Sequence, residues 1–174
     1  MTALPSDPSP DHGRHLPAGG YAARRLENFI SEVADAWGRG GLEEEQLRTP
    51  LLRLMEGISH DFGTPVTVFG EVPLKALGAG PDFGVDAKNT GRDPINRIGY
   101  IELKKPNKPI PPSDFVRGHD LKQWENLKSL PNLLYTNGTQ WSLFRYGVQR
   151  RHTVETPALF SKKRRRLPPQ CELE

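Results

Sequence analysis

The chain has 174 residues, the length of one ordinary domain, and its 24 Lys and Arg nearly balance its 21 Asp and Glu, leaving a formal net charge of +3. The single cysteine, Cys171, excludes an internal disulfide and favours a reducing, cytoplasmic setting. No apolar run approaches the roughly 18 residues of a membrane span, and the N-terminus lacks the layout of a signal peptide. We therefore expect a cytoplasmic protein with no membrane partner.

The two ends of the chain differ from its middle. Residues 1–18 contain four prolines and almost no large apolar side chains, so they cannot bury enough surface to offset chain entropy and predict a disordered leader. Residues 157–174 contain the run Lys162-Lys163-Arg164-Arg165-Arg166 and predict a basic flexible tail. A solvated charge run is the favoured interpretation of this tail, with phosphate contact or a localisation signal as alternatives. Residues 19–156 are left as the folded domain.

Two amphipathic helices are predicted before the first strand. From Ala22 to Trp37 the apolar positions recur at intervals of three and four residues, and glycines follow. A second helix is predicted from Leu42 to Ser59, with three glutamates at its positive N-terminal end. Pro50 is awkward inside this helix, because proline removes a backbone donor and clashes with the preceding turn, and the alternative is a short first helix ending near Thr49 with a second beginning at Pro50.

The rest of the domain predicts strands and one more helix. A helix is expected between Asp114 and Leu130, most clearly from Asp120 onward. The Asn137-Gly138 pair predicts a tight hairpin between the last two strands. The strand candidates are residues 64–72, 82–87, 99–104, 132–136 and 141–146, with residues 88–96 as a hairpin connection. This order predicts an α/β fold with a mixed central β-sheet flanked by helices.

Two carboxylates and one ammonium are the candidate catalytic groups. Glu102 and Lys104 lie two residues apart in a predicted strand, so their side chains point to the same face, and Asp82 opens the strand before it. Mg²⁺, for which Mn²⁺ can substitute, prefers oxygen ligands and can polarise a phosphate and activate water. We expect Asp82, Glu102 and the Leu103 backbone carbonyl to bind the metal and Lys104 to orient water. The alternatives are that Asp82 only starts a turn and that Glu102 and Lys104 form a surface ion pair.

These residues resemble the signature of the PD-(D/E)xK nuclease superfamily, which includes many restriction endonucleases. The resemblance extends over roughly residues 20–150. This stretch is similar to the N-terminal nuclease domain of bacterial restriction-modification polypeptides, in which an adenine-specific DNA methyltransferase follows in the same chain. The matching stretches are 71–75, 81–83, 99–106, 118–120, 123–124 and 130–138. The resemblance implies a restriction-endonuclease-like core and a Mg²⁺-dependent endonuclease that hydrolyses DNA phosphodiester bonds, part of a restriction-modification or related defence system.

The resemblance also implies two assisting residues. An acidic metal ligand on a preceding helix would match Glu44, although its neighbours Glu43 and Glu45 prevent a firm choice. A glutamine on the helix after the Glu-x-Lys strand would match Gln123, which would help to organise the site or contact the DNA backbone. The alternatives are solvated helix surface for the glutamates and, for Gln123, a capping box with Asp120.

The candidates for DNA contact are four residues that follow the Glu-x-Lys strand in the sequence: Lys105, Lys108, Arg117 and His119. Screened surface charge is the competing interpretation for the cations, and local hydrogen bonding is the simpler one for His119. The sequence has no paired Cys-x-x-Cys or His-x-x-x-His, which argues against structural zinc.

The chain departs from the restriction-modification pattern because it has no Gly-rich cofactor loop and no Asn-Pro-Pro-aromatic motif. It is then either a free-standing nuclease or a piece of something longer, with a DNA methyltransferase or specificity subunit as a partner, fused or separate. The oligomeric state is left open, with a dimer as one option. Two other functions remain: a non-cleaving DNA-binding or assembly module with a nuclease-like fold, and a nuclease acting on RNA or branched DNA.

Overall fold

The computed structural model describes residues 18–39, 43–78, 80–88, 96–106, 108–110 and 117–156. The predicted tail lies outside this part of the chain, and so does the predicted leader apart from Ala18, where the first helix begins. The middle of the predicted connection 88–96 and the start of the predicted helix 114–130 also lie outside it.

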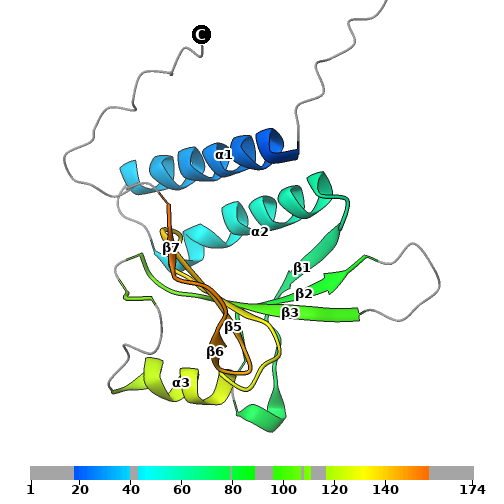
Figure 1. Ribbon diagram of the computed structural model, residues 1–174. Coiled ribbons are helices and arrows are strands. Elements are labelled where there is room, and N and C mark those ends of the chain that lie inside the picture. The colour runs from blue at the N-terminus through cyan, green and yellow to red at the C-terminus, as the bar shows by residue number, and fades with distance from the viewer. Residues whose placement is uncertain are drawn as a thin grey trace, which may run out of the picture.

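A mixed sheet forms the centre of the molecule. Helices α1 (Ala18–Gly38) and α2 (Glu44–Asp61) cover one face, and helix α3 (His119–Leu127) lies on the other face (Figure 1). The strands are β1 (Val66–Gly70), β2 (Phe83–Ala87), β3 (Asn96–Leu103), β4 (Leu133–Thr136), β5 (Gln140–Arg145), β6 (Val148–Gln149) and β7 (Val154–Glu155), and a 3₁₀ turn, η1, spans Lys75–Leu77. Their order is β1-β2-β3-β4-β5-β6, with β7 also paired to β5. The predicted α/β architecture with a mixed sheet flanked by helices is confirmed.

The strand pairing brings segments that are distant in sequence together at one end of the inner strands. Strands β2 and β3 are antiparallel, with Phe83 opposite Ile101, so the start of β2 lies beside the end of β3. Strands β3 and β4 are parallel, and all other pairs are antiparallel. The predicted hairpin at Asn137-Gly138 joins β4 to β5, where Gly138 adopts the left-handed conformation with a φ of 84°.

The alternative of a split at Pro50 does not occur, because α2 runs through this position without interruption. Proline inside a helix costs about 3 kcal/mol, through one lost hydrogen bond and one steric conflict. Pro50 is itself buried, as are Leu51 and Leu54 behind it. Burial of this apolar face against the rest of the fold offsets the local cost, which the sequence pattern alone does not reveal.

Each face of the sheet carries its own apolar cluster. Under α1 and α2 the cluster includes Phe29 and Leu47, and under α3 it includes Trp124 and Tyr135. Trp124 contacts the rings of Tyr135 and Phe144 edge to face, with centroids 5.7 and 4.8 Å away. These aromatic side chains belong to the core. Among the described residues no helix is both long enough and apolar enough to cross a bilayer.

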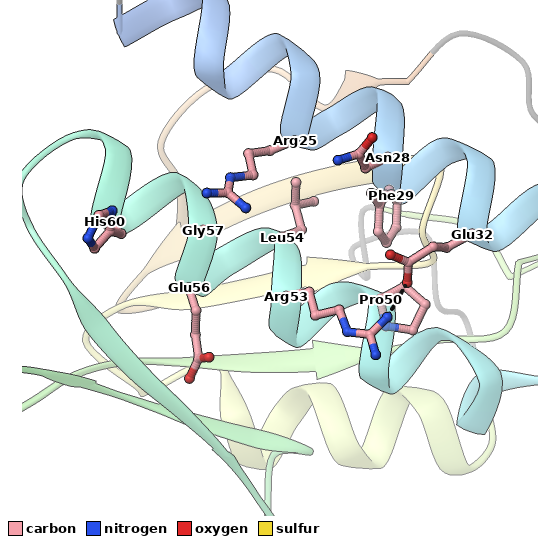
Figure 2. Close-up of a pocket in the computed structure, with 10 residues that line it drawn as sticks. All are labelled: Arg25, Asn28, Phe29, Glu32, Pro50, Arg53, Leu54, Glu56, Gly57 and His60. Carbon is pink, nitrogen blue, oxygen red and sulfur yellow. Dashed lines mark hydrogen bonds and ion pairs between the residues drawn. The ribbon is translucent and has the colours of Figure 1, made fainter. Parts of the chain in front are cut away.

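A groove of about 510 Å³ separates the outer surfaces of α1 and α2 (Figure 2). Ion pairs bridge it: Arg53 Nη1 lies 3.1 Å from Glu32 Oε2, and Arg25 Nε lies 3.1 Å from Asp61 Oδ2. At Gly57 a Cβ atom would approach the Arg25 side chain to 2.9 Å, so the small residue leaves room for that arginine. These contacts fix how the two helices pack.

Candidate active site

A second cavity of about 510 Å³ lies at the end of the inner strands where β2 begins and β3 ends. Its walls come from the N-terminus of α2, from β2 and β3, and from the start of α3. The lining residues are Glu44, Asp82, Glu102, Lys104, Lys105, Lys108, Arg117, Gly118, His119, Asp120 and Gln123. Every side chain that the sequence singled out for metal binding, catalysis or DNA contact is among them, and Leu103 lies between Glu102 and Lys104.

Lys104 is the centre of the buried part of this cavity. Its Nζ donates to Glu102 Oε1 over 2.7 Å and to Gln123 Oε1 over 2.5 Å. Glu102 and Lys104 share one side of the chain, as strand alternation predicts, and are only 1% and 6% exposed. The alternative of a surface ion pair is therefore wrong, because water does not screen this pair.

The carboxyl group of Glu102 lacks a hydrogen-bond partner for one of its two oxygens. Its Oε2 atom is buried and has no hydrogen-bond partner. Burial, together with the like charge of Asp82, raises the pKa of Glu102 to about 7 despite the attraction of Lys104. Burial and the charge of Asp82 likewise raise the pKa of Glu44. Three carboxylates on one cavity disfavour one another's ionised forms, a situation that a bound cation would relieve.

Asp82 faces two other elements rather than its own turn. Its Oδ2 accepts the backbone N–H of Leu103 over 2.8 Å, and its Oδ1 accepts Arg48 Nη2 over 2.8 Å. Burial raises the pKa of Asp82, although the Leu103 N–H and the Arg48 guanidinium oppose that rise. The side chain thus ties β2 to β3 and α2, and the interpretation of Asp82 as a simple turn residue does not describe these contacts.

The three adjacent glutamates have separate surroundings. Glu43 is the N-cap of α2, forms a capping box with Gln46, and pairs with Lys105 over 2.6 Å. Glu45 pairs with Arg48 over 2.9 Å, and its side chain is 83% exposed. Glu44 is the member of the run that lines the cavity. The geometry therefore favours Glu44 among the candidates that the sequence left open.

The alternative of a capping box between Asp120 and Gln123 is wrong. Helix α3 begins at His119, with Gly118 as its N-cap, so Asp120 already lies inside the first turn. The carboxylate of Asp120 instead reaches Lys108 Nζ at 2.5 Å and Lys104 Nζ at 3.8 Å. The Gln123 side chain does not cap the helix and instead accepts a hydrogen bond from Lys104 Nζ.

The predicted DNA-contacting residues surround the mouth of the cavity. Lys105 and Lys108 are paired with Glu43 and Asp120, while Arg117 and His119 are exposed. The cavity thus has an acidic floor and a rim in which positive side chains predominate.

Sequence reasoning missed two contributors, Arg48 and Asp120. Arg48 lies one turn after Glu44 on α2, so helical spacing places both on one side of the helix. That spacing was the available signal. Its contact with Asp82 joins residues 34 positions apart, which no local pattern predicts.

The cavity has the chemistry of a hard-cation site. Its candidate ligands, Glu44, Asp82 and Glu102, offer carboxylate oxygens of the kind that Mg²⁺ and Mn²⁺ prefer. The buried, unpartnered Oε2 of Glu102 fits a metal ligand. Within the described ranges, however, no three or more His, Cys, Asp or Glu side chains are grouped so that they could hold a metal ion. Both oxygens of Asp82 already accept hydrogen bonds.

Comparison with known proteins identifies the fold. No protein-family model and no curated protein matches the chain. A chain in the cryo-EM structure of the DrdV–DNA complex is similar to it, with a TM-score of 0.56 and 16% identity over 76% of this chain and 85% of that one. The two chains share a fold. At this identity the likeness concerns the fold alone, and with the sheet topology it confirms the predicted restriction-endonuclease-like core.

Proposed function

We propose that the chain is a metal-dependent endonuclease that hydrolyses DNA phosphodiester bonds, with Mg²⁺ as its cofactor and Mn²⁺ as a substitute. The observation that carries the proposal is the buried contact between Glu102 and Lys104 beside Asp82, with Glu102 Oε2 unpartnered. The fold neighbour was determined in a complex with DNA, which supports DNA as the partner.

The chain's own residues divide the chemistry among them. Glu44, Asp82, Glu102 and the Leu103 carbonyl would hold the metal, which when bound polarises the phosphate and lowers the pKa of water. Lys104 orients the attacking water and offsets the negative charge that develops on the phosphate oxygens. Gln123 holds the Lys104 ammonium through a 2.5 Å hydrogen bond, so the lysine has a fixed position before substrate arrives.

The rim of the cavity would receive the DNA backbone. Lys105, Lys108, Arg117 and His119 line the opening around the acidic floor. Lys105 and Lys108 would exchange their carboxylate partners for phosphates when DNA binds, so affinity should fall steeply as salt concentration rises. A DNA methyltransferase or specificity subunit, in the same polypeptide or another, would then supply sequence recognition within a restriction system.

A plasmid-nicking assay in Mg²⁺ and in Mn²⁺ tests the proposal. Lys104→Met should lower the cleavage rate by at least about 10²-fold, the usual effect of losing one electrostatic group, while DNA affinity stays close to that of the wild type. Lys122→Met is the matched control, since Lys122 is an exposed lysine of α3 outside the cavity. Metal-dependent cleavage that survives in Asp82→Asn or Glu102→Gln at the wild-type rate would refute the proposed mechanism.

One observation favours a second function, a non-cleaving DNA-binding or assembly module. Both oxygens of Asp82 have donors already, as they would in a site that binds no metal. A protein that binds DNA with a steep salt dependence, and leaves plasmid intact in both metals, would establish this function. A panel of RNA and branched DNA substrates separates the remaining alternative.

A further inference from the structure

Arg48 contacts one carboxylate oxygen of Asp82. Its Nη2 lies 2.8 Å from Asp82 Oδ1, and its Nε lies 2.9 Å from Glu45 Oε2. The guanidinium also stands over the Phe83 ring, 4.9 Å from the centroid. Arg48 is thus held between the N-terminal turn of α2 and the first residues of β2, behind Asp82, which lines the carboxylate cavity.

A guanidinium and a divalent cation compete for one carboxylate oxygen. Asp82 Oδ2 accepts the Leu103 N–H and Oδ1 accepts Arg48 Nη2, so we take Oδ1, whose donor is a side chain that can move, as the oxygen that turns to a metal. A metal ion at Oδ1 would stand next to Arg48 Nη2, and two positive charges in contact with the same oxygen repel strongly where water is scarce. Metal binding through Oδ1 would therefore weaken the contact with Arg48 and favour its displacement.

The surroundings of Arg48 lower the free-energy cost of breaking its contact with Asp82. Its Nε keeps Glu45 as a partner, and its flat face keeps the Phe83 ring, when the Nη2 contact breaks. Because 23% of the Arg48 side chain is exposed, water can solvate the released nitrogen. Leucine or methionine at this position would leave Asp82 with one donor, the Leu103 N–H, and would remove one of the positive charges near the cavity.

We propose that Arg48 is a positioning residue that holds Asp82 Oδ1 in the metal-free protein and is displaced from it when a divalent cation binds. This inference rests on the proposed function, because it takes the carboxylate cavity as the cation site. Arg48 then sets the cation affinity of the site: it keeps Asp82 in place before the metal arrives, and it weakens metal binding by the free energy of its own displacement.

The test is a calorimetric titration of Mn²⁺ into the wild type and Arg48→Met, without DNA. We expect the variant to bind Mn²⁺ about ten-fold more tightly, equivalent to about 1.4 kcal/mol. In chelator its melting temperature should be lower, and its gain on adding Mn²⁺ larger. Arg48→Lys keeps the charge with a shorter reach, so its affinity should fall between the two, and it serves as the second variant where Arg48→Met does not fold.

Arg53→Met is the matched control. Arg53 lies on the same helix and pairs with a carboxylate, Glu32, but on the outer groove between α1 and α2 (Figure 2). Its side chain is 68% exposed, and its replacement should leave the Mn²⁺ affinity unchanged.

The possible outcomes separate this inference from the proposed function. Equal or weaker Mn²⁺ binding by a folded Arg48→Met protein overturns the inference and leaves the nuclease proposal standing. Binding by the variant alone supports the inference, since Arg48 would then exclude the metal outright. If neither protein binds Mn²⁺, the cavity is not a cation site and both proposals fall.

Discussion

Replacing Glu102 with glutamine should stabilise the metal-free protein, even though Glu102 is the best buried of the candidate metal ligands. Glu102 is 1% exposed, and its Oε2 has no partner. Its pKa is raised from 4.5 to about 7, chiefly by burial. At about 1.4 kcal/mol for each pKa unit, that difference corresponds to roughly 3 kcal/mol of strain in the ionised form. Glutamine has the shape of the protonated acid and carries no such penalty.

The effect depends on pH in a definite direction. Between pH 4.5 and about 7 the folded protein binds more protons at Glu102 than the unfolded chain does, so stability falls as pH rises through this window. The stability advantage of Glu102→Gln should therefore be small near pH 4.5, grow through the window, and reach roughly 3 kcal/mol above pH 8. Saturating Mg²⁺ should reduce or reverse it, because only the wild type keeps the full carboxylate set.

Urea unfolding in EDTA, followed by circular dichroism at pH 5 and at pH 8.5, measures this directly. An advantage that does not change between the two pH values would refute the assignment of a raised Glu102 pKa. A variant less stable than the wild type at pH 8.5 would show that the loss of the Lys104 contact outweighs the relief of burial.

Three further predictions concern the core, one tight approach and the rim. Leu47→Ala should cost about 2–5 kcal/mol in urea unfolding, because Leu47 lies fully buried on the inner face of α2. Gly80→Ala should cost about 1–3 kcal/mol, since a Cβ there would lie 2.5 Å from the Val72 carbonyl oxygen, and a stability equal to the wild type would contradict that contact. Replacing Lys105 and Lys108 with alanine should reduce the slope of log affinity against log salt by roughly 2 in DNA-binding titrations, whereas an unchanged slope would place the DNA elsewhere.

Local patterns predicted most of the elements. Apolar spacing placed a helix over 22–37, where α1 runs, and the Asn137-Gly138 pair fixed the β4–β5 hairpin. Strand alternation put Glu102 and Lys104 on one side, which is the main geometric fact of the cavity. These features depend on neighbours in sequence, so the sequence carries them.

Other features depend on contacts between distant segments. Pro50 stays within α2 because the helix is buried there, and Arg48 meets Asp82 across 34 residues. The two-residue strands β6 and β7 are too short to leave a periodic signal. Asp120 was interpreted as a cap because its local sequence suits one, whereas its actual partner is Lys108.

The cavity draws its side chains from α2, β2, β3 and α3, which are synthesised in that order. A chain still leaving the ribosome therefore presents Glu44, Asp82 and Glu102 before Gln123 and the β4 strand exist. The Lys104 backbone N–H is held by Thr136 of β4, at 2.8 Å, so the lysine gains its support last. A chain that ends before α3 and β4 therefore lacks both supports of Lys104, the Gln123 side chain and the Thr136 carbonyl.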